Sequence, residues 1–161
     1  MEIFGNGLFW AFLGAALAAL LPGIGSARGC GMVGEAATGL LAEDPSKFGS
    51  AIILEALPGT QGIYGLLIAF LSLLKLNVFG GVIEQISLGQ GIGMFLACLP
   101  IAFVGLFSAI FQARCAVGGV AILAKKPKDV FKGVSLAAVV ETFAIFALLI
   151  SFLMLYMVNW Q

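Results

Sequence analysis

The hydrophobic pattern of the chain consists of four long charge-free stretches separated by short polar breaks. The stretches are residues 3–27, 56–74, 85–113 and 142–161, with lengths of 25, 19, 29 and 20 residues. A helix of about 20 residues crosses a hydrocarbon layer of ~30 Å and satisfies its own backbone hydrogen bonds where water is absent. The pattern therefore predicts an all-α membrane protein with four transmembrane helices.

The first stretch could also be interpreted as a cleaved signal peptide. However, it follows Glu2 instead of a basic segment, it is long for the apolar core of a signal peptide, and three further stretches come after it. We therefore expect it to belong to the mature protein.

The polar breaks after the first and third stretches are short and contain proline. They read Glu43-Asp44-Pro45-Ser46-Lys47 and Lys125-Lys126-Pro127-Lys128-Asp129, and the helical pattern runs up to each of them. Two tight hairpins are predicted, whose first helices would each have about 35 residues and a length of ~50 Å.

Lysines indicate the orientation of these hairpins in the membrane. Lys47, Lys128 and Lys132 lie with other basic residues near the two breaks, whereas Lys75 is the one cation of the linker over residues 75–84. Because cytoplasmic loops carry an excess of Lys and Arg, both hairpin turns are expected in the cytoplasm and both termini on the opposite side. We expect a multi-pass protein of a bacterial plasma membrane.

The two halves of the chain are copies of one repeat. An offset of 82 residues aligns residues 15–73 with residues 97–155 without a gap, and about 18 of the 59 aligned positions are identical. Identical pairs include Gly23/Gly105, Ser26/Ser108, Pro45/Pro127 and Thr60/Thr142. Each half holds two spans, so the repeats are parallel. We place the hairpins at residues 1–78 and 79–161.

Composition restricts the function to a few residues. The chain is 61% apolar and 10% charged, has a mean hydropathy of +1.14, carries no histidine and is formally neutral. A neutral chain offers no electrostatic basis for binding nucleic acid. The three cysteines, Cys30, Cys98 and Cys115, are too widely spaced for a zinc or iron–sulfur motif.

Glu141 is an acidic residue inside a membrane span. It lies 14 residues beyond Pro127, which corresponds to ~20 Å along a helix and places it near the middle of the bilayer. A charge at that depth costs at least ~2.5–3.5 kcal/mol, so the residue is predicted to bind a proton or a cation. A structural carboxylic acid bonded between helices is the alternative.

Polar groups gather around the position that corresponds to Glu141 in the first repeat, which is Gly59. Leu57, Thr60, Gln61 and Tyr64 follow the i, i+3, i+4, i+7 spacing of one helix face. Pro58 has no N–H and leaves the carbonyl of residue 54 without its usual donor.

Gln112, a lone amide in the third span, is a further candidate for this site. One carboxylate, one hydroxyl, two amide oxygens and a free carbonyl would form an oxygen-rich site with a single negative charge, which suits Na⁺ better than a divalent ion. Hydrogen bonds that only hold the bundle together are the alternative function of Thr60, Gln61 and Gln112.

Glycines in the first span resemble a dinucleotide-binding motif, because residues 29–34 read GCGMVG. No strand is expected before them, and they continue a transmembrane helix. Gly14, Ala18, Gly25 and Gly29, together with Gly23, Ala27 and Gly31, instead predict a narrow helix surface for close packing.

These motifs identify the chain as similar to the c-type proteolipid of V-type rotary ATPases, the duplicated rotor-ring subunit, and most similar to its bacterial sodium-translocating form. The most specific stretches are GIGSA at residues 23–27, LPGTQGIYG at residues 57–65, PIAF at residues 100–103, LAKKP at residues 123–127 and VET at residues 140–142. The resemblance implies Na⁺ ligands at the Leu57 carbonyl, Thr60, Gln61, Gln112 and Glu141, with a hydrogen bond from Tyr64 to Glu141.

The resemblance also implies the assembly. Many copies would form a homo-oligomeric ring with the first and third helices inside, surrounded by lipid and turning against a stator membrane subunit. A central-stalk subunit would dock at the cytoplasmic hairpins, and the subunit itself would catalyse no reaction. The alternatives are a proton-translocating ring of the same fold, a small four-helix multidrug exporter, and a structural adaptor.

Overall fold

The computed structural model describes residues 3–158, without the side chain of residue 3, and the outermost residues at both termini lie outside the described range. It contains long helices, joined by short 3₁₀ turns. The elements are η1 (Ile3–Gly5), α1 (Gly7–Glu43), η2 (Pro45–Lys47), α2 (Phe48–Ala56), η3 (Leu57–Gly59), α3 (Thr60–Lys75), η4 (Val78–Gly80), α4 (Leu88–Lys125), η5 (Pro127–Asp129) and α5 (Val130–Met157).

Four helical spans in the described part of the chain are long and apolar enough to cross a membrane. They confirm the predicted all-α fold of an integral membrane protein. α1 and α4 have 37 and 38 residues, close to the predicted length. They begin at Gly7 and Leu88, a few residues later than the charge-free stretches, because Asn6 and Ser87 cap their first turns.

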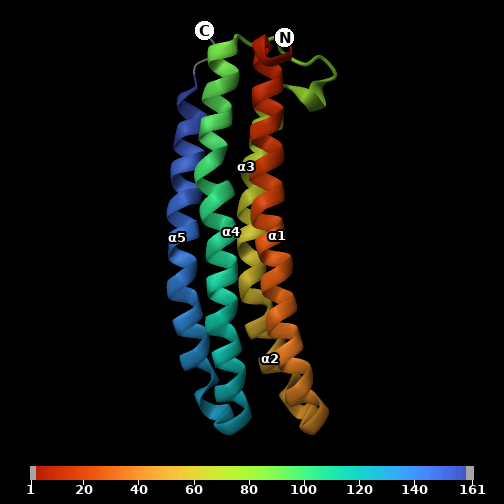
Figure 1. The fold of residues 1–161 in the computed structure, drawn as a ribbon, viewed down its shortest axis with the longest axis vertical. Coiled ribbons are helices and arrows are strands. Elements are labelled where there is room, and N and C mark those ends of the chain that lie inside the picture. Colours follow the sequence, from red (N-terminus) through yellow and green to blue (C-terminus); the bar gives the residue numbers. More distant parts are fainter. Residues whose placement is uncertain (1–2, 159–161) are drawn as a thin grey trace.

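The two hairpins pack side by side as parallel units (Figure 1). α1 and α4 lie against each other along most of their length, α3 packs beside α1, and α5 packs beside α4. Alanine is the most frequent of the buried side chains, and its small size lets the helix backbones approach closely. The proposed hairpin boundary between residues 78 and 79 falls in η4, within the linker between α3 and α4.

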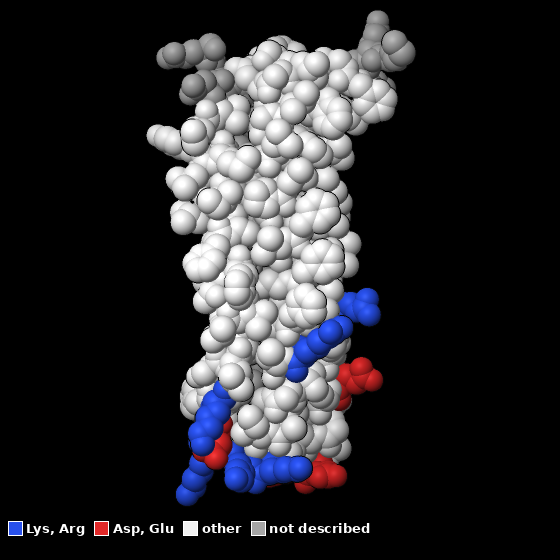
Figure 2. Space-filling model, turned by 60° about the vertical axis from the view of Figure 1, so that its left-hand side comes forward, with Lys and Arg blue, Asp and Glu red and all other residues white. Residues whose placement is uncertain are grey.

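Charged side chains gather at the end of the molecule where the hairpins turn. Figure 1 shows both turns at one end and the ends of the chain at the other, and Figure 2 shows the Lys, Arg, Asp and Glu side chains of one face near the turns. Lys47 donates to the carbonyl oxygen of Ala124 at 3.2 Å and joins the two turns. At the opposite end, Lys75 donates to the carbonyl oxygens of Leu155 and Val158, both at 2.6 Å.

The predicted close-packing surface of the first span is divided between two faces. Gly14, Ala18, Gly25 and Gly29 are buried, and a Cβ added at Gly25 would lie 2.6 Å from the carbonyl oxygen of Leu106. Ala27 and Gly31 are exposed, and a Cβ at Gly31 would meet nothing within 4 Å. The GCGMVG segment is helical and lies within α1, as predicted, and residues 3–158 contain no strand.

Candidate ion-binding site

The polar groups of the site come from three segments, namely the break between α2 and α3, the middle of α4 and the middle of α5. Proline at residue 58 interrupts the second span, which passes through the 3₁₀ turn η3 between α2 and α3. The carbonyl of Leu57 opens this turn, and Thr60, Gln61 and Tyr64 follow it in the first two turns of α3. The interruption lies where the sequence predicted it.

Hydrogen bonds connect these segments around the carboxylate of Glu141. The hydroxyl of Tyr64 donates to Oε1 of Glu141 at 2.6 Å, and Nε2 of Gln112 donates to Oε2 at 3.3 Å. Nε2 of Gln61 donates to Oε1 of Gln112 at 2.5 Å. The carboxylate of the second repeat is therefore held by α3 of the first repeat and α4 of the second.

Thr60 and Leu57 extend this network toward the 3₁₀ turn. The hydroxyl of Thr60 lies 3.0 Å from the carbonyl oxygen of Leu57, to which it donates, and 3.4 Å from Oε1 of Gln61. The structure thus brings all six residues selected from the sequence into one connected network. The oxygen atoms of Leu57, Thr60 and Gln61 gather on the α3 side of it.

Burial differs sharply across the network. Gln61 and Gln112 are fully buried, at 0% exposure, whereas Tyr64, Thr60 and Glu141 are half-buried. Leaving a buried amide without a hydrogen-bond partner costs about 1–3 kcal/mol of folding stability. The hydrogen bond between Gln61 and Gln112 therefore holds both side chains in place on the buried side of the site. Glu141 is therefore less completely enclosed in a single copy than the two glutamines.

The donor set suits a monovalent cation. Within residues 3–158, no three His, Cys, Asp or Glu side chains lie close enough together to hold a metal ion. Glu141 is the carboxylate of the network, and its other oxygens belong to a hydroxyl, amides and a carbonyl. One negative charge and neutral oxygen ligands can balance one positive charge in a low dielectric.

Two serines support the site and were absent from the candidates chosen by sequence. Ser108 accepts a hydrogen bond from Nε2 of Gln61 at 3.3 Å and donates to the carbonyl oxygen of Val140 at 3.1 Å. Ser26 accepts from the backbone N–H of Gly62 at 2.8 Å. The repeat alignment pairs Ser26 with Ser108, and this identity of two polar residues in apolar helices was the available signal.

Comparison with known proteins agrees with the repeat. The ATP synthase C subunit family matches residues 13–72 and again residues 95–154. The two matches start and end 82 residues apart, which confirms the repeat register predicted from the sequence.

Two relatives are named as subunits of an ATPase and of an ATP synthase. The chain is 50% identical over 149 residues to the V-type sodium ATPase subunit K of Enterococcus hirae, covering 92% of both chains. It is 40% identical over 143 residues to the A-type ATP synthase subunit K of Methanocaldococcus jannaschii, covering 89% of this chain and 60% of that protein. With two tandem matches and a relative of half-identical sequence, the chain belongs to the ATP synthase C subunit family.

Proposed function

We propose that the chain is the rotor-ring subunit of a Na⁺-translocating V-type ATPase and that each copy carries one Na⁺ at Glu141. The observation that carries the proposal is the network around Glu141, which joins both repeats through hydrogen bonds between side chains. The half-identical Enterococcus hirae relative, named as a sodium ATPase subunit, supports the choice of ion.

The ligands of Na⁺ in this proposal are Glu141, Gln112, Gln61, Thr60 and the carbonyl of Leu57. Tyr64 is the supporting residue, because its hydroxyl donates to Glu141 and holds the carboxylate in place. Na⁺ is the cargo of the site and H⁺ the alternative cargo. The subunit itself catalyses no reaction.

Ion occupancy controls which copies of the chain are able to face lipid. Glu141 is half-buried in a single copy, so part of the residue lies at the surface of the bundle. A bound cation neutralises the carboxylate, whereas an empty carboxylate would cost at least ~2.5–3.5 kcal/mol in the bilayer. Rotation of loaded copies through lipid is therefore favoured, and unloading requires a compensating cation on a stator membrane subunit.

The placement of charge suggests where the partners bind. The lysine-rich hairpin turns lie at one end of the molecule, and we place them in the cytoplasm of a bacterial cell, in contact with a central-stalk subunit. Both termini then face the opposite side of the plasma membrane. Copies of the chain form the ring, with α1 and α4 inside and with lipid outside.

Covalent labelling of Glu141 tests the proposal. A hydrophobic carbodiimide reacts with a carboxyl group in the membrane, and bound Na⁺ should block this reaction at fixed pH. We expect millimolar Na⁺ to suppress labelling of the purified native ring. Thr60→Ala, which removes one ligand oxygen, should raise the protecting Na⁺ concentration by about tenfold, corresponding to ~1.4 kcal/mol.

The controls separate the alternatives. Glu141→Gln should abolish labelling, which assigns the reaction to this residue. If the extent of labelling does not depend on Na⁺ but decreases as the pH rises, the sodium site is overturned in favour of a proton-translocating ring. A stable dimer of the native protein would overturn the rotor in favour of the small multidrug exporter.

A further inference from the structure

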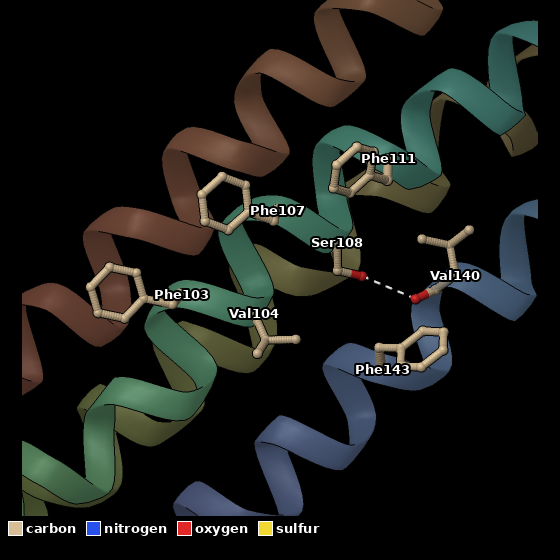
Figure 3. Close-up of a pocket in the computed structure, with 7 residues that line it drawn as sticks. All are labelled: Phe103, Val104, Phe107, Ser108, Phe111, Val140 and Phe143. Carbon is tan, nitrogen blue, oxygen red and sulfur yellow. Dashed lines mark hydrogen bonds between the residues drawn. The ribbon is translucent and has the colours of Figure 1, made fainter.

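A groove between α4 and α5 is lined by side chains that one copy of the chain leaves uncovered. It has a volume of about 280 Å³, and its walls include Phe103, Phe107 and Phe111 from α4 with Val140 and Phe143 from α5. Figure 3 shows the three phenylalanine rings in a row along α4, with α5 and its Phe143 beside that helix. These rings are 50–54% exposed, and Phe143 is 61% exposed.

The repeat indicates what covers such a groove. Moving back by 82 positions, Phe107 and Phe111 correspond to Gly25 and Gly29, and Phe143 corresponds to Gln61. These three first-repeat residues are buried by α4 of the second repeat. A Cβ at Gly29 would lie 3.1 Å from the carbonyl oxygen of Ala109, and Gln61 bonds to Gln112. The groove of the first repeat is thus filled within the chain, while the matching groove of the second repeat is open.

The helix surface that would fill such a groove is exposed in the first repeat and buried in the second. A stripe along α1, which we name the α1 stripe, consists of exposed residues: Ala16, Leu20, Ile24, Ala27 and Gly31. Their counterparts on α4 pack against the first repeat. Of these counterparts, Cys98, Ala102, Ala109 and Ala113 have 0% exposure. The residues of α4 that correspond to the α1 stripe are therefore buried in the groove of the first repeat. The α1 stripe itself is exposed in a single copy.

We propose that the α1 stripe of a second copy of this chain seats in the α4–α5 groove. This inference rests on the proposed ring and gives its contact surface and register. Figure 1 places α1 and α5 at opposite edges of the bundle, so the stripe and the groove can be used at the same time. Such a head-to-tail interface adds copies in one direction and produces a ring when the rotation closes.

The register follows from the contacts inside the chain. Gly25 meets Leu106, and Gly29 meets Ala109 and Ala113. When these contacts are shifted by one repeat, Phe107 lies against Ile24 of the second copy, and Phe111 lies against its Ala27 and Gly31. Phenylalanine replaces glycine on the α4 side, so the small residues that make room are on the α1 side.

The two seams therefore differ in chemistry. The seam inside the chain is closely packed through glycine and holds the polar network of Glu141. The seam between copies is filled by phenylalanine rings and has Gly59 and Cys30 at the positions of Glu141 and Gln112. It forms a dry contact without an ion.

A bump-and-hole exchange tests the interface. Gly31 has open space around it in one copy, so Gly31→Leu should leave the fold intact and collide with Phe111 of the neighbouring copy. We expect the yield of intact ring from detergent extracts to fall about tenfold, and Phe111→Ala in the same chain to restore it to within about twofold. Native mass spectrometry of the purified protein gives both values.

Gly39→Leu is the matched control on α1. Gly39 also has nothing within 4 Å of an added Cβ, but its counterpart Ala121 stays exposed beside the other repeat, whereas Ala113, the counterpart of Gly31, is buried. Gly39→Leu should leave the ring yield unchanged. The interface would be overturned if Gly31→Leu alone left the ring yield unchanged, which is the result expected if lipid fills the groove. It would also be overturned if Gly39→Leu lowered the ring yield equally, or if Phe111→Ala did not restore it.

Failure of the interface is distinguishable from failure of the proposed function. A native protein that runs as single copies contradicts the ring itself. A native ring that tolerates Gly31→Leu contradicts only the contact surface. Protection of Glu141 by Na⁺ is measured separately and depends on residues within one chain.

Discussion

The two hairpins have the same fold but contribute different halves of one site. The first hairpin contributes Thr60, Gln61 and Tyr64 from α3, and the second contributes Gln112 and Glu141. At the exchanged positions, the alignment pairs Gln61 with Phe143, Tyr64 with Phe146, Gln112 with Cys30, and Glu141 with Gly59. At these four aligned positions each hairpin lacks the polar side chain that the other has, so four helices hold one complete polar site.

Exchanging Gln112 for the residue of the other hairpin should have the largest effect. Gln112→Cys removes one donor to Glu141 and one acceptor of Gln61, which is fully buried. Unpaired buried polar groups cost about 1–3 kcal/mol, so the Na⁺ concentration that protects Glu141 from carbodiimide should rise about 10- to 100-fold. Cys30→Ser, at the matching position, should leave that concentration unchanged, and an equal shift in both variants would refute the asymmetry.

Exchanging Tyr64 should have a smaller effect. Tyr64→Phe copies the other hairpin and removes one hydrogen bond to Glu141, but the phenol is only half-buried and Gln112 still holds the carboxylate. An ordinary hydrogen bond contributes about 0.5–1.5 kcal/mol, so half-maximal protection should need about three- to tenfold more Na⁺. Phe146→Tyr is the control, and a comparable shift there would show that the phenol acts without the carboxylate.

The smallest effect is expected at the hairpin turns, where Asp44 in the first repeat corresponds to Lys126 in the second. Hydrogen bonds from Ser46, with a contribution from Lys47, hold the pKa of the Asp44 carboxyl below its ordinary value. The hydroxyl of Ser46 donates to Oδ1 of Asp44 at 2.6 Å, and Nζ of Lys47 lies 3.2 Å from Oδ2. Because the folded form has the lower pKa, this stabilisation is present above the unfolded pKa and disappears as pH falls through the folded pKa.

Asp44→Asn should therefore lower Tm by no more than about 2 °C at neutral pH, with the difference vanishing in acid. The measurement is thermal unfolding of the purified protein in detergent as a function of pH. Ser46→Ala should reproduce part of the loss. A difference in Tm that grows toward low pH would contradict the assignment of the stabilisation to the ionised carboxylate.

Much of the fold and of the site follows from the sequence because apolar helices in a bilayer obey simple constraints. The spans, their hairpin order and the repeat register all follow from charge-free lengths, prolines and an 82-residue offset. Glu141 is recognisable by its isolation in an apolar stretch. The face of α3 is recognisable by helical spacing, since Leu57, Thr60, Gln61 and Tyr64 follow the i, i+3, i+4, i+7 pattern.

Contacts between segments distant along the chain were not recognisable in this way. Ser108 joins Gln61 and Val140 across 47 and 32 residues, and a lone serine in an apolar helix gives no local sign of such partners. Lys75 belonged to the linker by sequence, but it donates to carbonyls at the end of α5, 80 and 83 residues away. A flexible lysine can reach several acceptors, and the packing of α3 beside α5 selects among them.

The sequence by itself determined that this protein crosses a membrane four times as a duplicated hairpin with one carboxylate in its apolar interior. These properties depend on composition and period, which local physics converts directly into helices. Only the tertiary structure decided which small residues of α1 pack inside the copy and which remain open, because both sets have the same four-residue spacing. Gly25 and Gly29 face α4 and are buried, while Ala27 and Gly31 face outward, a choice set by the rotation of one long helix against another.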